Sequence, residues 1–184
     1  MTPRRGRVYT DGVKNKAIPD SAPREGWRLW RCATDPSSAV LYSVTQWQFS
    51  WKPRQTVVAQ CPDCGPDAPG RKCRCGLHST KTLPHLMRLN YVDYNTEAGL
   101  MAVLGVVANW GKIEEWTEGY KAARSYPLRL WVPYECWRMV GPLEDAYGVP
   151  VGLRNLFKDA AFQMGNPFED PFEETEPRKE KAWR

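Results

Sequence analysis

Four of the six cysteines of this 184-residue chain fall within fifteen residues. They form a Cys-Pro-Asp-Cys-Gly segment at residues 61–65 and a Cys-Arg-Cys-Gly segment at residues 73–76. Thiolates in closely spaced pairs are typical ligands of a tetrahedral zinc ion. The spacing therefore predicts one zinc ion, and the predicted ligands are Cys61, Cys64, Cys73 and Cys75.

The two halves of this motif differ in regularity. In the first half a proline fixes the backbone before the turn, and Gly65 permits the positive φ that lets amide groups point at sulfur. The second half has a single residue between its cysteines, one fewer than the usual pair. If that short spacing excludes one cysteine, His78 is the first substitute ligand. The more distant alternatives are Cys32 and His85.

Ligand type favours a structural ion over a catalytic one. A catalytic zinc keeps a coordination position open for water, with a carboxylate base nearby, whereas four cysteines fill the tetrahedron. The His-x-Glu segment that zinc deaminases carry before Pro-Cys-x-x-Cys is absent, and so are the glycine-rich loops that bind phosphates. The alternative of four unmetallated cysteines is disfavoured by their density along the chain.

Aromatic content is the second unusual feature, with nine tryptophans and eight tyrosines. Exposed Trp and Tyr beside cationic side chains can stack nucleic-acid bases or form a protein-binding hot spot, although large aromatic residues also fill cores. We therefore expect a binding surface that combines aromatic and cationic side chains. Its candidate members are Trp47, Trp51, Trp116, Tyr120, Lys121 and Arg124.

Composition indicates a globular protein, with 42 % hydrophobic and 26 % charged residues. No apolar run approaches the ~20 residues of a membrane-spanning helix, and no apolar stretch follows the basic N-terminus as it would in a secretory signal. We therefore expect a cytoplasmic protein with no membrane partner. Thiols stay reduced in that compartment, which favours metal ligands over disulfides.

Charge and Pro/Gly content divide the chain into three parts. Residues 1–25 carry scattered basic side chains and three prolines, which predicts a disordered basic arm. Residues 155–184 contain the near-copies NPFED and DPFEE, which predicts a flexible acidic and charged tail. Residues 26–154 are the predicted zinc-stabilised globular domain.

Most of that domain is predicted to be strand. Alternating large apolar and basic residues predict a strand at 27–32. Residues rich in β-branched and aromatic side chains predict strands at 39–49, 56–60 and 128–132.

The strongest local signal is a hairpin. Residues 103–110, 112–116 and 120–125 are predicted as antiparallel strands around a turn at 117–119, and Gly111 is predicted as a bend or bulge between the first two.

Two short helices complete the prediction. One is expected at 79–89, capped by Ser79 or Thr82, and one at 134–147, divided near the Gly-Pro pair at 141–142. The predicted fold class is α+β and β-rich: an antiparallel sheet or partly open barrel, with a small four-cysteine zinc lobe and one or two helices.

Four motifs follow one another across roughly residues 27–150, and they occupy residues 51–53 before Cys61, 73–77, 105–113 and 119–128. In this order they resemble a family of small uncharacterised proteins of actinobacteria and actinobacteriophages. That family usually shows an isolated cysteine, often with a nearby histidine, where this chain has Cys61-x-x-Cys64. The resemblance implies a compact, metal-stabilised β-rich domain and an accessory phage role, and it implies no activity.

The function that we expect is a non-enzymatic, zinc-stabilised binding module. It would be an accessory phage or actinobacterial protein that acts on a host protein in the host cytoplasm. One alternative is a nucleic-acid-binding protein that uses the basic arm and exposed Trp and Tyr side chains. The other is an enzyme with a zinc-supported pocket.

Overall fold

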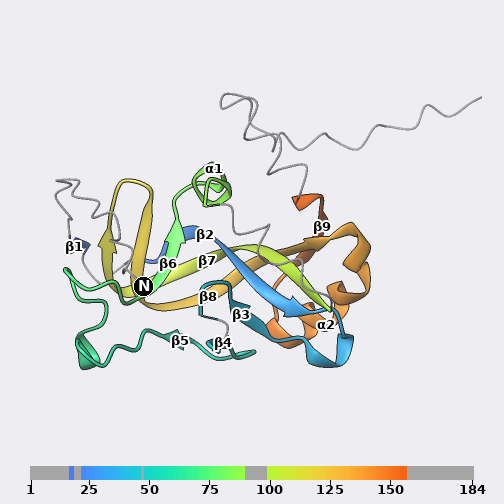
Figure 1. The fold of residues 1–184 in the computed structure, drawn as a ribbon, viewed down its shortest axis with the longest axis horizontal. Helices are drawn as coiled ribbons and strands as arrows, with labels where there is room; N and C mark the ends of the chain where they lie inside the picture. The colour runs from blue at the N-terminus through green and yellow to red at the C-terminus, as the bar shows by residue number, and fades with distance from the viewer. Residues whose placement is uncertain (1–16, 19–21, 47, 90–98, 157–184) are drawn as a thin grey trace, which may run out of the picture.

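A long antiparallel hairpin forms the centre of the fold (Figure 1). The computed structural model describes residues 17–18, 22–46, 48–89 and 99–156. The hairpin strands are β7 (Leu100–Glu115) and β8 (Gly119–Pro133). Strand β7 runs through Gly111, whose φ of +74° favours glycine, and the register with β8 shifts between Trp110 and Ile113. The predicted turn at 117–119 and the bulge at Gly111 are confirmed, but the segments predicted as separate strands at 103–110 and 112–116 are one strand, and those at 120–125 and 128–132 both belong to β8.

Two further strands bend the hairpin into a ring. Strand β2 (Arg24–Ala33) pairs with β7 along its whole length, and β6 (Leu77–Thr80) pairs with β8. The ring closes through the single pair Trp27↔Thr80 between β2 and β6. A ring that only one residue pair closes is a partly open barrel. The predicted β-rich α+β fold is therefore confirmed.

Short strands extend this ring at its edges. Strands β3 (Leu41–Ser43) and β4 (Ser50–Trp51) continue from β2, β1 (Ala17–Ile18) pairs with β7, and β5 (Val57–Val58) pairs with β8. Strand β9 (Val151–Arg154) runs parallel to β8, whereas the other strand pairs of the described residues are antiparallel. Ala17, Ile18, Arg24 and Glu25, all inside the predicted basic arm, thus lie in strands.

Two apolar clusters fill the two faces of the sheet. Neighbouring residues of β2 point into different clusters, as the two-residue period of a strand requires. Trp30 packs with Leu143 of α2 (Val140–Tyr147) in the larger cluster. Leu29 packs with Leu83 of α1 (Leu83–Met87) in the smaller one.

Three sequence-based boundaries need correction. Of the strand predicted at 39–49, only Leu41–Ser43 forms a strand, β3, and β4 begins after the predicted range at Ser50. Ser79 lies in β6 instead of capping a helix, because β6 pairs with β8; Thr82 caps α1 by accepting the His85 amide. The helix predicted at 134–147 is a 3₁₀ helix, η4 (Tyr134–Met139), followed by α2.

Candidate metal centre

The four predicted ligands converge in a loop that connects β5 to β6. We call residues 61–76 the cysteine lobe. The sulfur atoms of the four cysteines all lie within 4.8 Å of one another. The sulfurs of Cys61 and Cys73 are 3.7 Å apart, and those of Cys64 and Cys75 are 3.6 Å apart. Each contact joins one cysteine of the first half to one of the second, so the site ties the two halves of the lobe together.

These separations fit a shared metal ion better than a disulfide. A disulfide requires sulfurs about 2.05 Å apart, and all four thiols are free. Thiolates bound to zinc lie about 2.3 Å from the ion, which places the corners of a regular tetrahedron about 3.8 Å apart. The measured 3.6 and 3.7 Å are close to that value. The chemistry and spacing of the donor set therefore fit one tetrahedral ion.

Tight turns hold the two halves in place. The Gly65 amide donates to the Cys61 carbonyl oxygen at 2.9 Å, and the φ of Gly65 is +55°, as the first half of the motif predicted. In the loop between the two halves, the Gly70 amide donates to the Cys75 sulfur at 3.3 Å. A Cβ at Gly70 would lie 2.5 Å from the Cys64 sulfur, so only glycine lets the backbone approach the site this closely.

Two lysines of the hairpin fasten the lobe to the barrel. The Lys121 ammonium donates to the Gly70 and Cys73 carbonyl oxygens at 2.9 and 2.8 Å, and only 9 % of this residue is exposed. The Lys112 ammonium donates to the Asp67 carbonyl oxygen at 3.0 Å. Both lysines therefore hold the lobe through its backbone carbonyl oxygens.

The thiols of the cluster titrate unequally. Hydrogen bonding to the Cys75 backbone is the main factor that lowers the pKa of Cys73 to about 7. Hydrogen bonding with the Cys75 and Cys61 thiols raises the pKa of Cys64 to about 12. Four adjacent thiolates repel one another, so a metal-free cluster keeps protons that a divalent cation would displace.

The alternative ligands lie outside this cluster. The Nε2 atom of His78 is 2.9 Å from the Arg74 carbonyl oxygen. Cys32 is buried in the larger apolar cluster, and His85 lies on α1. Among the described residues, the group of side chains around the four sulfurs contains neither a histidine nor a carboxylate.

The predicted aromatic surface is only partly accessible, and Trp51 requires correction. Trp51 is fully buried, because the Trp30 ring packs edge-on against it with centroids 5.2 Å apart and the Arg28 guanidinium covers its face at 4.6 Å. The prediction that Lys121 belongs to an exposed binding surface is also wrong, since its ammonium group is directed into the lobe. Trp47 lies outside the described residues.

The other three members of the predicted surface remain near solvent. Trp116 and Tyr120 are half-buried beside the hairpin turn, and Arg124 is exposed on β8. Trp116 also lies beside His78, with ring centroids 5.7 Å apart.

Sequence reasoning missed the two most exposed aromatic side chains among the described residues. Tyr134 is 57 % exposed and Trp137 is 59 % exposed, both on η4. The backbone between them departs from helical geometry at Cys136, where φ is −99° and ψ is 23°. Residue type alone does not indicate their exposure, because Trp131, a tryptophan nearby in the sequence, is half-buried.

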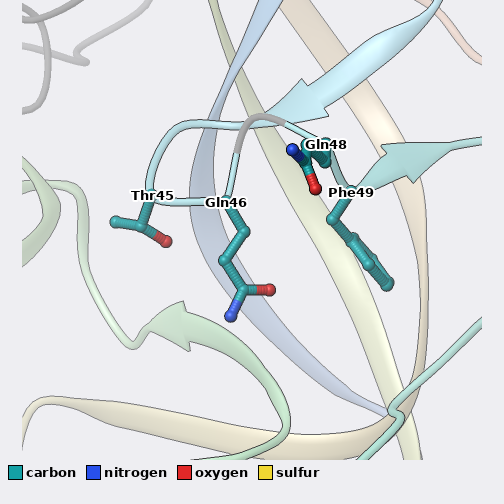
Figure 2. A pocket seen from close by; sticks show the side chains of 4 residues that line it. All are labelled: Thr45, Gln46, Gln48 and Phe49. Carbon is teal, nitrogen blue, oxygen red and sulfur yellow. The ribbon is translucent and has the colours of Figure 1, made fainter.

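A depression of about 460 Å³ lies at the loop between β3 and β4. Figure 2 shows its lining side chains, with those of Gln46 and Phe49 extending in the same general direction. The lining residues are Thr45, Gln46, Gln48 and Phe49. None of them is a titratable acid or base, so this lining offers hydrogen bonds and apolar contact.

No family model, curated protein or solved structure matches this chain. The resemblance to actinobacterial and phage proteins therefore stays a prediction. Among the described residues, no helix has the length and apolar character needed to cross a membrane.

Proposed function

We propose that the protein is a non-enzymatic binding module whose cysteine lobe is held by one structural zinc ion. The observation that carries this proposal is the convergence of four cysteine sulfurs at the spacing of a tetrahedral thiolate site. Tetrahedral sulfur sites hold zinc or iron, and zinc is the ion for which a closed Cys₄ site is typical in a structural role.

The composition of the lobe supports a structural role for the metal. Ala68 and Pro69 are the only residues of 61–76 that are buried, so the lobe has almost no apolar core. Four thiolates also fill a tetrahedron, which leaves no position for a water molecule or a substrate. The ion would therefore stabilise the lobe against the barrel instead of activating a nucleophile.

The remaining parts of this proposal come from the sequence. The resemblance supports an accessory protein of a phage or an actinobacterium, with the host cytoplasm as its location and a host protein as its first predicted partner. Tyr134 and Trp137 are the exposed aromatic side chains that a protein partner would engage, because interface hot spots are rich in Trp and Tyr.

Metal analysis and cobalt substitution test the metal assignment. Protein purified under reducing conditions is expected to contain about one zinc per chain, as four thiolate ligands require. Cobalt-substituted protein should show the absorption bands of a tetrahedral all-sulfur site. Cys64→Ser should lose this spectrum, whereas Cys136→Ser, a matched change in η4, should keep it. Bound iron, the absence of metal, or equal effects of both substitutions would contradict the proposal.

A further inference from the structure

Five exposed cations lie on the cysteine lobe and on the strands next to it. Two lie in the loop between the two cysteine pairs, one lies between the cysteines of the second pair, and two lie on the hairpin strands β7 and β8 beside the lobe. They are Arg71, Lys72, Arg74, Lys112 and Arg124, and we call this surface the lobe face. The salt bridges between described residues, Lys81–Glu115 and Arg88–Glu118, involve none of the five.

The charged groups in and around the lobe divide into a buried lysine and exposed side chains. Lys121 occupies the buried side of the lobe and donates to the Gly70 and Cys73 carbonyl oxygens. The three cations of the lobe, Arg71, Lys72 and Arg74, remain exposed to solvent. The lobe also carries two exposed carboxylates, Asp63 and Asp67, and the Lys112 ammonium lies against the backbone of the second.

Aromatic rings lie next to these cations. Trp116 and His78 pack beside each other, and His78 bonds through Nε2 to the carbonyl oxygen of Arg74, one of the five exposed cations. Trp110 is half-buried on β7, directly opposite Arg124 in the strand register. The lobe face thus combines cations with indole rings on neighbouring strands.

From this combination we infer that the lobe face binds single-stranded nucleic acid. The inference rests on the proposed function, because zinc would hold Arg71, Lys72 and Arg74 in one orientation. The cations contact the phosphate backbone, and a base stacks on Trp116. Single strands fit this surface because their bases are free to stack on an indole, whereas those of a duplex are already stacked on one another.

Fluorescence anisotropy tests this inference on the zinc-loaded full chain. The probes are labelled twelve-nucleotide oligothymidylate and oligouridylate, which distinguish DNA from RNA, and a DNA duplex of the same length. We expect at least one single strand to bind about tenfold more tightly than the duplex, with an affinity that falls steeply as salt rises. Failure to bind either strand would overturn the inference and leave a protein as the partner class. Equal affinity for the duplex would also overturn it.

Charge variants locate the contact. Combined Arg71→Gln, Lys72→Gln and Arg74→Gln should weaken binding at least about tenfold and reduce the log–log salt slope by about 2, since each phosphate contact on a single strand contributes about 0.7. The control carries Lys52→Gln, Arg129→Gln and Arg138→Gln, the same charge change away from the lobe. Equal effects of the two triple variants would overturn the inference. The N-terminal residues are retained in every variant, so they do not affect this difference.

An aromatic pair tests the stacking step. Trp116→Leu should weaken binding about fivefold or more, the loss typical of one stacked base, and Trp137→Leu should leave it unchanged. Zinc content and melting temperature are measured on the same samples. A folded, zinc-loaded protein that binds no single strand would overturn this inference alone, whereas protein without metal would overturn the proposed function.

Discussion

The cysteine lobe and the α2 end of the barrel lie at opposite ends of the molecule and are stabilised differently (Figure 1). At the α2 end, Leu143 is fully buried, and the Tyr147 hydroxyl accepts from the Leu41 amide and donates to the Trp51 carbonyl oxygen. The lobe instead has four converging thiols and a lysine that donates to its backbone. Apolar packing orders the α2 end, whereas the lobe, which has almost no apolar core, relies for its order on the proposed metal ion.

The largest expected effect is the loss of a metal ligand. Cys61→Ser should lower the free energy of unfolding by about 3 kcal/mol or more, because the binding energy of a structural zinc ion is folding energy. Denaturant titration in the presence of zinc measures this loss, with Cys136→Ser as the control. An unchanged free energy of unfolding for Cys61→Ser would refute the structural role of the metal.

A core truncation at the α2 end should lower the free energy of unfolding without affecting zinc binding. Leu143→Ala should cost about 2–5 kcal/mol, because it leaves a cavity in the larger apolar cluster. The variant should still bind one zinc per chain, since α2, which carries Leu143, lies at the other end of the molecule from the lobe (Figure 1). Denaturant titration and metal analysis check the two halves of this prediction. A folded variant that no longer binds zinc would show that the two ends are coupled.

A smaller effect is expected where the lobe meets the barrel. Lys121→Met keeps the apolar stem and removes both hydrogen bonds to the lobe backbone, which should weaken zinc binding about 10–100-fold, as removal of supporting contacts around metal ligands does. Competition with a colorimetric chelator measures the affinity. Lys112→Met, which removes a single hydrogen bond, is the control and should cost less.

The smallest effect is expected at Tyr147. Tyr147→Phe should cost about 1–2 kcal/mol, because it removes both hydrogen bonds of a buried hydroxyl. Burial raises the pKa of this phenol above its usual value near 10, so its contribution is complete below about pH 10 and falls as the pH rises further. The free-energy difference between wild type and variant, measured at pH 8 and pH 10.5, should therefore shrink at the higher pH. A difference that grows would contradict this assignment.

Local patterns predicted the convergence of the four cysteines and the hairpin, because both depend on residues close in sequence. The positive φ at Gly111 and the turn before Gly119 are local features of this kind. Burial of Trp51 depends instead on Trp30 and Arg28, which lie more than twenty residues away. Lys121 is buried because the lobe folds over it, so its sequence neighbours give no sign of that environment.

Hydrogen exchange with and without a zinc chelator tests the central claim most directly. We predict that metal removal increases amide exchange throughout residues 61–76 while the amides of α2 keep their protection, because apolar packing stabilises that end. An unchanged lobe after metal removal, or an equal loss of protection at both ends, would contradict the account.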